Sequence, residues 1–255
     1  MEFNTKKVTK ELLIWLRNWF IENGKDCNAV LGVSGGKDST VAAALCVNAL
    51  GKDRVIGVMM PNGDQKDISD SIRVCKLLDI PNITINIKDS VDAETKLLLS
   101  GAKALGKEEL TSQTIINLPP RIRMATLYGI SQTMNGRVIN TCNLSEEWVG
   151  YSTRWGDSVG DVAPLANLTV DEVRKVGLEL GLPYDLVYKT PSDGLCGKTD
   201  EENLGFTYEE LDKYLRTGEC NPKVQELIDQ KHINNKFKLL PISSFKYGKV
   251  LTKVR

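Results

Sequence analysis

The segment Ser34-Gly35-Gly36-Lys37-Asp38-Ser39 sets glycines, hydroxyls, a cation and a carboxylate between an apolar run and an Ala-rich stretch. Glycines let a backbone approach an anion closely, and the free N–H groups at the start of a helix carry about half an elementary positive charge. The hydroxyls can add hydrogen bonds. This order of residue types predicts a loop that binds phosphate groups.

Lys37 and Asp38 add chemistry beyond simple anion binding. Lys37 can supply a counter-charge to a phosphate, and Asp38 can hold Mg²⁺ against it, because Mg²⁺ prefers carboxylate, phosphate and water oxygens. The spacing GxxxxGK[ST] of a Walker loop is absent around these residues. An ordinary strand-turn-helix connection, whose glycines serve only the turn, is the alternative interpretation.

The elements around this loop alternate between strand and helix. Strands that alternate with helices of ten or more residues imply right-handed crossovers and a parallel sheet covered on both faces. We therefore expect the α/β fold class, with a doubly wound parallel sheet, flanking helices and a C-terminal part of helices and loops. The expected strands are residues 29–33, 55–60, 83–87 and 137–141, and the expected helices are 39–50, 68–78, one from about 91 and one from near Pro120.

The N-terminal segment, residues 5–23, predicts an amphipathic helix that ends at Gly24. Two interpretations of its apolar face stay open, because such a face can pack on the core of the same chain or on another subunit. The residues of this face are Val8, Leu12, Trp15, Leu16, Trp19 and Phe20.

Beyond the fourth expected strand, helix-start signals replace the strand pattern. Thr169 with Glu172, and Thr207 with Glu210, have the spacing of capping boxes. The polar stretch 190–205 is longer than a routine connection, so we expect a lid or a partly disordered loop there.

Composition excludes several classes of protein. Lys plus Arg and Asp plus Glu both total 33 in 255 residues, so the chain has no net charge for holding a nucleic acid, and its apolar segments are too short to cross a membrane. With His232 as its only histidine, a zinc site or a Ser-His-Asp triad is hard to build. We expect a cytoplasmic protein with reduced thiols at Cys27, Cys46, Cys75, Cys142, Cys196 and Cys220.

The phosphate-binding segment resembles the SGGxDS loop of ATP pyrophosphatases, which bind the β- and γ-phosphates as a leaving unit and attack the α-phosphorus. Further segments resemble those of ammonia-dependent NAD synthetases, in order and at matching spacing. This resemblance implies a fold of the adenine nucleotide alpha hydrolase type, in a single domain over residues 1–255. The segments are 60–67 (MPYxxQxD in the family), 140–146 (GTxNxSE), 151–161 (FFTKYGDGGxD), 161–166 (DINPIA), 189–195 (KxPSADL) and 200–212 (DExELGxxYExID).

The resemblance implies which residues hold ATP and the metal ion. Asp38 and Glu146 would hold Mg²⁺. The residues that would contact ATP are Gly32, Val33, Ser34, Gly35, Gly36, Lys37, Asp38, Ser39, Thr141 and Ser192. Both carboxylates follow expected parallel strands, on the edge of the sheet where ligands bind. As alternatives, Glu146 would be half of an exposed acidic pair and Ser192 a helix cap.

The resemblance also implies a substrate-binding set and a catalytic set. Arg121, Arg154 and Asp161 would contact deamido-NAD, while Asp38, Lys37 and Asp161 would be catalytic. Asp161, or its neighbour Asp157, would help to deprotonate ammonium. As alternatives, both arginines would be surface cations, with Arg121 opening a helix after the prolines, and Asp161 would be a turn residue.

The reaction that the resemblance implies is amidation. The nicotinate carboxylate of deamido-NAD would attack the α-phosphorus of ATP, and ammonia would displace AMP from the adenylate to give NAD. The family also implies a homodimer, with the helix over 121–135 and the Trp15/Trp19 stripe as candidate contacts. Two other classes stay open: an ATP pyrophosphatase for another carboxylate substrate, and a non-catalytic ATP-binding module.

The chain departs from the family pattern at several substrate-closing positions. Val170 replaces a lysine near an ATP phosphate, so Lys37 or Lys175 would have to supply that charge. Lys236-Phe237-Lys238 replaces the family's HKR, which leaves a substrate contact only for Lys236. Ser192-Asp193-Gly194-Leu195 reorders the usual SADL. These departures put affinity in doubt more than the class of reaction.

Overall fold

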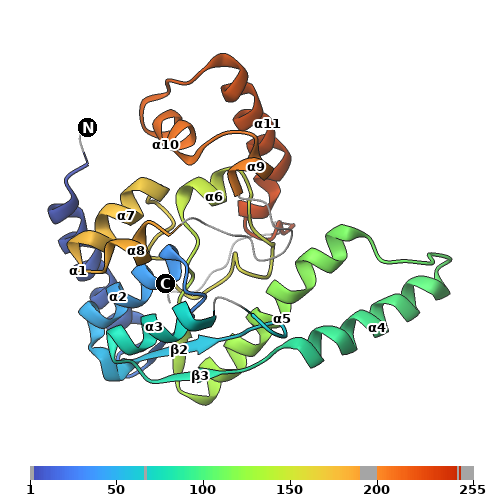
Figure 1. Cartoon of the computed structure of the whole chain (residues 1–255), viewed down its shortest axis with the longest axis horizontal. Helices are drawn as coiled ribbons and strands as arrows, with labels where there is room; N and C mark the ends of the chain where they lie inside the picture. Colours follow the sequence, from blue (N-terminus) through green and yellow to red (C-terminus); the bar gives the residue numbers. More distant parts are fainter. Residues whose placement is uncertain (1–2, 66–67, 190–199, 246, 248–255) are drawn as a thin grey trace.

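The computed structural model describes residues 3–65, 68–189, 200–245 and 247. Its centre is a four-stranded parallel sheet in the order β3-β2-β1-β4 (Figure 1). Because the order reverses beside β1, the segment after this central strand faces the crevice where ligands bind in such sheets. The predicted doubly wound α/β class is confirmed. The strands are β1 (Asn28–Gly32), β2 (Val55–Met59), β3 (Asn82–Thr84) and β4 (Gly136–Val138).

One face of the sheet is covered by a helical layer with α2 at its centre. Alternate residues of β1 point to opposite faces, so Ala29 and Leu31 pack with this layer while Val30 joins the other face. Val41 and Leu45 of α2 are fully buried, which fixes the helix that follows the phosphate-binding segment. The helices of this layer are α1 (Thr5–Gly24), α2 (Lys37–Leu50), α3 (Ile68–Leu78), α7 (Val170–Glu179) and α8 (Tyr184–Val187).

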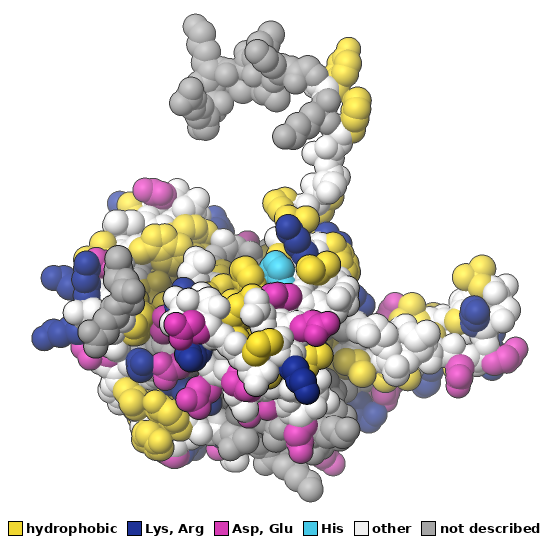
Figure 2. Space-filling view, turned by 90° about the horizontal axis from the view of Figure 1, so that it is seen from above, with side chains coloured by type: hydrophobic (Ala, Val, Ile, Leu, Met, Phe, Trp, Pro, Cys, Tyr) yellow, Lys and Arg dark blue, Asp and Glu magenta, His cyan; other side chains and the backbone are white. Residues whose placement is uncertain are grey.

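The opposite face is covered by α5 (Ser112–Thr133), whose Leu127 packs with Val30 and Val138. The N-terminal half of α5 leaves the sheet and packs against α4 (Lys88–Ala104). These two helices project together from the body as an arm, at the right of Figure 1. The space-filling view shows hydrophobic side chains at the tip of this arm (Figure 2).

The C-terminal helices pack around a second apolar cluster. It is tied to the main body by Asp212, whose Oδ1 accepts from the Ser145 hydroxyl at 2.5 Å and whose Oδ2 accepts from the Asp171 N–H at 2.9 Å. Ser145 Oγ in turn accepts from the Val170 N–H at 3.1 Å. This part contains α6 (Leu144–Trp148), α9 (Asp200–Leu204), α10 (Tyr208–Thr217) and α11 (Pro222–Leu239). A short 3-10 helix, η1 (Lys52–Arg54), precedes β2 in the main body.

Both predicted capping boxes are confirmed. Thr169 caps α7, where its Oγ1 accepts from the Glu172 N–H while the Glu172 carboxylate accepts from the Thr169 N–H. Thr207 and Glu210 do the same for α10. The first N–H groups of a helix have no partner within the helix, and these side chains accept hydrogen bonds from them, so the two capping boxes fix where α7 and α10 begin.

The N-terminal helix packs mainly on its own chain. Leu16 and Phe20 are buried in the main core, and Trp19 packs against it. Trp15 is 44% exposed, so the two tryptophans do not act as one stripe. Core packing is the interpretation that this geometry supports for most of the face.

Several predicted boundaries are wrong. The helix expected from near Pro120 begins eight residues earlier, at Ser112, because Thr111 caps it and the prolines lie inside it; Arg121 therefore lies within the helix and does not open it. The strand expected over 83–87 is shorter in the structure, where β3 covers Asn82–Thr84 at the edge of the sheet. Residues 200–204, expected as loop, form α9, while residues 190–199 lie outside the described residues.

The fourth strand is also shorter than predicted, for a reason visible in its hydrogen bonds. Ile139 still donates its N–H to Val30 O, but it forms an isolated bridge with Val162. Asn140 then donates to Val162 O at 2.9 Å. The chain thus leaves the sheet toward the segment around Val162, and this turn brings residues 140–146 over the end of β1.

The described cysteines are free thiols, as predicted: Cys27, Cys46, Cys75, Cys142 and Cys220. Cys196 lies outside the described residues. Among the described helices, none is both long and apolar enough to cross a membrane.

Candidate active site

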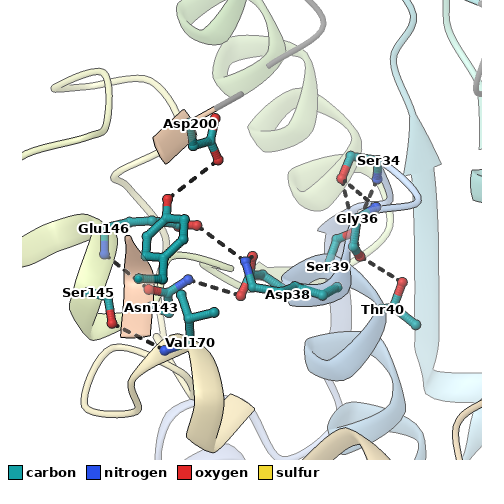
Figure 3. A network of polar contacts seen from close by, with 12 residues as sticks. Ser34, Gly36, Asp38, Ser39, Thr40, Asn143, Ser145, Glu146, Val170 and Asp200 are labelled. Atoms are coloured by element: carbon teal, nitrogen blue, oxygen red, sulfur yellow. Dashed lines mark hydrogen bonds and ion pairs between the residues drawn. The ribbon is translucent and has the colours of Figure 1, made fainter. Parts of the chain in front are cut away.

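The phosphate-binding segment forms a tight turn from β1 into α2 (Figure 3). The Ser34 and Ser39 hydroxyls lie 3.1 Å apart, and Ser34 Oγ accepts from the Gly36 N–H at 3.2 Å. Thr40 Oγ1 donates to Gly36 O at 2.8 Å. Gly35 has a φ of +79°, and a Cβ there would lie 2.8 Å from the Cβ of Asp70. The turn therefore requires glycine at 35, both for its backbone conformation and for its approach to α3.

Lys37 lies at the centre of the site and does not extend into solvent. Its Nζ is 2.8 Å from Asp38 Oδ2 and 3.5 Å from Glu146 Oε1, and the side chain is only 4% exposed. Burial disfavours its charge, but the two carboxylates outweigh burial and raise the pKa of Lys37 above its ordinary value. The ammonium is therefore held in its charged form between the two acidic groups.

Asn143 connects the two predicted metal ligands. Its Nδ2 donates to Asp38 Oδ1 at 3.0 Å, while its Oδ1 accepts from the Glu146 N–H at 3.0 Å and caps α6 (Figure 3). Asn143 is completely buried. One amide thus sets both the direction of the Asp38 carboxylate and the start of the helix that carries Glu146. Sequence reasoning quoted this residue within a motif but gave it no role.

The surroundings of Glu146 disfavour its negative charge. Burial and the nearby charge of Asp38 raise the pKa of Glu146 to about 8, although Lys37 and Asn143 oppose the shift. A divalent ion between Asp38 and Glu146 would relieve this repulsion. In the described part of the chain no three His, Cys, Asp or Glu side chains gather as a metal cage. Two carboxylates fit Mg²⁺ bound together with a nucleotide's phosphates, which supply the remaining oxygens.

Tyr208 and Asp200 form a wall of the site that sequence reasoning missed. Lys37 Nζ lies 5.7 Å from the centre of the Tyr208 ring, and the Tyr208 hydroxyl donates to Asp200 Oδ2 at 3.4 Å. Tyr151 donates to the other oxygen of Asp200 at 3.1 Å. Burial, with the charges of Glu146 and Asp200, raises the pKa of Tyr208, so its phenol stays protonated. The only sequence signal for this wall was the motif over 200–212.

Two of the predicted substrate-binding residues come together. Arg121 Nε donates to the backbone oxygen of Arg154 at 3.3 Å, which joins α5 to the loop after α6. Pro120 lies on the same side of α5, where it packs against Gly156. Pro120 therefore packs toward the loop that carries Arg154.

The other predicted site residues have different surroundings. Asp161 Oδ2 accepts from the Val138 N–H at 2.7 Å, and its Oδ1 accepts from Tyr128 at 3.4 Å, so this carboxylate completes the hydrogen bonding of β4. Thr141 is half-buried, two residues before Asn143. Ser192 lies outside the described residues.

The two lysines predicted as substitutes for the missing family lysine lie in different surroundings. Val170 is fully buried in the C-terminal cluster, so that position contributes no charge. Lys175 is half-exposed and forms an ion pair with Asp171 at 2.6 Å. Of the two proposed substitutes, Lys37 is the one that lies in the site.

The parallel sheet, the glycine turn after its central strand and the two carboxylates beside that turn define an α/β nucleotide-binding protein of the adenine nucleotide alpha hydrolase type. A family model for NAD synthase matches residues 8–245. The chain belongs to this family.

Curated relatives and solved structures agree with the family match. The chain is 36% identical over 248 residues to an NH3-dependent NAD(+) synthetase of Finegoldia magna, covering 96% of this chain and 98% of the relative. It is 35% identical to one of Carboxydothermus hydrogenoformans, covering 89% and 92%. A solved NMN synthetase of Francisella tularensis superposes with a TM-score of 0.86 at 30% identity, over 96% of this chain and all of that one. An NH3-dependent NAD synthetase of Campylobacter jejuni gives 0.75 at 28%, over 96% and 100%.

Proposed function

We propose that the chain is a ligase that amidates deamido-NAD with ammonia to form NAD, with ATP as co-substrate and AMP and pyrophosphate as products. One observation carries this proposal: Asp38 and Glu146 meet at Lys37, directly beside the glycine turn, in a chain that matches the NAD synthase family over residues 8–245. A chain that only sensed ATP would have no need for two partly buried carboxylates that share one lysine.

In the first step, the nicotinate carboxylate attacks the α-phosphorus of ATP and pyrophosphate leaves. The reaction brings two anions together, so the protein contributes mainly alignment and positive charge. The N–H groups of the turn, with the Ser34 and Ser39 hydroxyls, receive the leaving pyrophosphate. Lys37 holds a positive charge beside it, and Thr141 and Ser192 add contacts to ATP.

In the second step, ammonia attacks the carbonyl carbon of the adenylate and displaces AMP. Arg121 and Arg154 hold deamido-NAD while this happens, and Asp161 contacts it and helps to deprotonate ammonium. Asp38 and Glu146 are the residues that hold Mg²⁺, which supplies charge neutralisation on the phosphates when bound. Asn143 keeps these two carboxylates aligned through its hydrogen bonds to Asp38 and to the Glu146 N–H.

A second candidate substrate is nicotinate mononucleotide. The observation in its favour is the TM-score of 0.86 with the solved NMN synthetase, against 0.75 for the NAD synthetase of Campylobacter jejuni. The mononucleotide and the dinucleotide carry the same nicotinate carboxylate, so the same steps can amidate either one.

An end-point assay tests both candidates. Purified protein is mixed with ATP, Mg²⁺, ammonium and either deamido-NAD or nicotinate mononucleotide, and the amide product is measured alongside AMP. NAD formed in step with AMP supports the first candidate, whereas a higher kcat/KM for the mononucleotide supports the second. Neither amide nor AMP would contradict both, and reactions without ammonium are the control.

We also propose a single-domain enzyme that works in the cytoplasm as a homodimer. The α4–α5 arm supports assembly, because it carries exposed apolar side chains at Leu97, Leu105, Ile115 and Ile116. Sedimentation at micromolar concentration checks the dimer, and a species of only 28.3 kDa would contradict it. Cell fractionation checks the location.

A further inference from the structure

Arg154 contacts two aromatic rings that come from different parts of the chain. Its guanidinium carbon is 4.9 Å from the centre of the Trp155 ring and 5.4 Å from the centre of the Phe237 ring. Trp155 belongs to the loop after α6, whereas Phe237 lies near the end of α11. We name these three residues the Arg154 stack.

Within the described part of the chain, the guanidinium of Arg154 contacts aromatic rings but has no anionic partner. Among the described residues, no carboxylate forms an ion pair with it, and its buried Nε has no hydrogen-bond partner. A guanidinium presents donors in a planar fork that suits phosphate oxygens, and its flat faces stack well on aromatic rings. The stack therefore leaves the edge of Arg154 to bind an anion that comes from outside the chain.

Neighbouring contacts hold the stack in place. Trp155 has a φ of +63°, a left-handed conformation that is strained for a residue with a side chain. Lys238, next to Phe237, donates to Gly150 O at 2.8 Å and to Ser152 O at 3.1 Å, which fixes the end of α11 to the loop. The contact between Arg121 Nε and the Arg154 carbonyl brings a second cation to the same place.

Phe237 occupies the position where the chain departs from the HKR pattern of its family. With Lys236 in place of the family's histidine, the departure exchanges the lysine at position 237 for an aromatic residue without a net loss of positive charge. It adds an aromatic face that is in contact with Arg154 and still 54% exposed. A cation–π contact favours one orientation of the Arg154 guanidinium. The residue at position 237 therefore contributes by positioning Arg154 and not by a charge of its own.

We propose that Phe237 and Trp155 are positioning residues, which fix Arg154 so that its guanidinium binds phosphoryl oxygens of deamido-NAD. This inference rests on the proposed function, since deamido-NAD is the substrate for which Arg154 was assigned. Phe237 acts only through Arg154, and its removal therefore weakens the binding of deamido-NAD and leaves ATP binding unchanged.

The test compares Phe237→Leu with Phe237→Tyr, which keeps the ring, and Trp155→Leu with Trp155→Phe. We expect each leucine variant to raise KM and the calorimetric Kd for deamido-NAD about two- to fivefold, equivalent to about 0.5 to 1 kcal/mol for one cation–π contact. KM for ATP and kcat should stay within about twofold. The Tyr and Phe variants should restore the wild-type values. Phe245→Leu is the matched control, because Phe245 is an exposed phenylalanine outside the stack.

Three results would overturn the inference. They are an unchanged Kd in both leucine variants, equal losses in the Tyr and Leu variants, and a KM for ATP that rises as much as that for deamido-NAD. The Trp155 pair repeats the test at an independent position, which covers a failure of Phe237→Leu to fold. Calorimetry reports on the stack even without turnover, so a wild-type protein that binds deamido-NAD but forms no NAD contradicts the proposed function alone.

Discussion

The two carboxylates around Lys37 allow a quantitative test of whether they hold one ion together. The variants are Asp38→Asn, Glu146→Gln and the double variant, each of which removes a charge and keeps the shape. Asp38 lies 2.8 Å and Glu146 3.5 Å from Lys37 Nζ. At an effective dielectric constant of about 20, the gross Coulomb attraction between each carboxylate and a cation at the position of Lys37 Nζ is about 5 kcal/mol, so neither carboxylate dominates.

Both single variants should therefore lose similar amounts of turnover. Removing one group that stabilises charge in a transition state costs about 3 to 4 kcal/mol, or roughly 10² to 10³ in kcat. If both carboxylates hold the same Mg²⁺, the first loss already removes most of the benefit. The double variant should then lose little more than either single one, as expected for residues that act as a unit.

The assay is AMP release with saturating ATP and deamido-NAD, over a range of Mg²⁺ concentrations. The single variants should need more Mg²⁺ for half-maximal rate. We expect the single variants to fold, because Lys37 keeps one carboxylate partner in each of them, and urea unfolding checks this. Asp53→Asn is the control, because Asp53 is an exposed acid in η1. Losses that multiply in the double variant, to about 10⁴ or more, would refute the shared ion, and wild-type turnover in Asp38→Asn would refute its role altogether.

Three further predictions concern stability and reactivity. In the folded protein the pKa of Glu146 is raised from 4.5 to about 8, so between these pH values the folded chain holds a proton that the unfolded chain has lost. In EDTA, the contribution of Glu146 to the free energy of unfolding should therefore fall as the pH rises from 4.5 to 8. Glu146→Gln should remove this pH dependence in urea titrations. Asp212→Ala should lower the free energy of unfolding by about 2 to 4 kcal/mol in urea, because it leaves the Ser145 hydroxyl and a backbone N–H buried without their partner, and an unchanged midpoint would contradict this. Burial raises the pKa of Cys46 to about 12, so peptide mapping after iodoacetamide treatment of the native protein should find Cys220 alkylated and Cys46 unmodified, whereas a modified Cys46 would show that the core opens.

The elements predicted best are those that local signals define. The apolar run that became β1 is bounded by a glycine turn, and the capping boxes at Thr169 and Thr207 fix the starts of α7 and α10 within the sequence itself. The start of α5 was wrong because Pro119 and Pro120 normally lie in the first turn of a helix. Here the helix continues through them, and Pro120 packs on Gly156, a contact that no local pattern could reveal.

The candidate site divides in the same way. The glycine turn and Asp38 follow from residue type and spacing, since one short segment contains them. Asn143 reaches Asp38, and Tyr208 reaches Lys37, from far along the chain, and only the packing of α6 and α10 brings them there. Their motifs were visible in the sequence, but their contacts were not. The Arg154 stack could not be predicted for the same reason, because the sequence shows Phe237 only as the replacement of a family lysine.

The projecting arm of α4 and α5 should behave as a local unit of unfolding. Its base is anchored by Ile87, Val91 and Leu118, but Leu105 near the tip is 84% exposed. In an isolated chain, little buried apolar area opposes fraying there, so its backbone amides should exchange with deuterium soon after dilution. A second copy that covered the arm would slow this exchange. The amides of the arm would then report assembly residue by residue, as protection that grows with protein concentration while that of β1 stays constant.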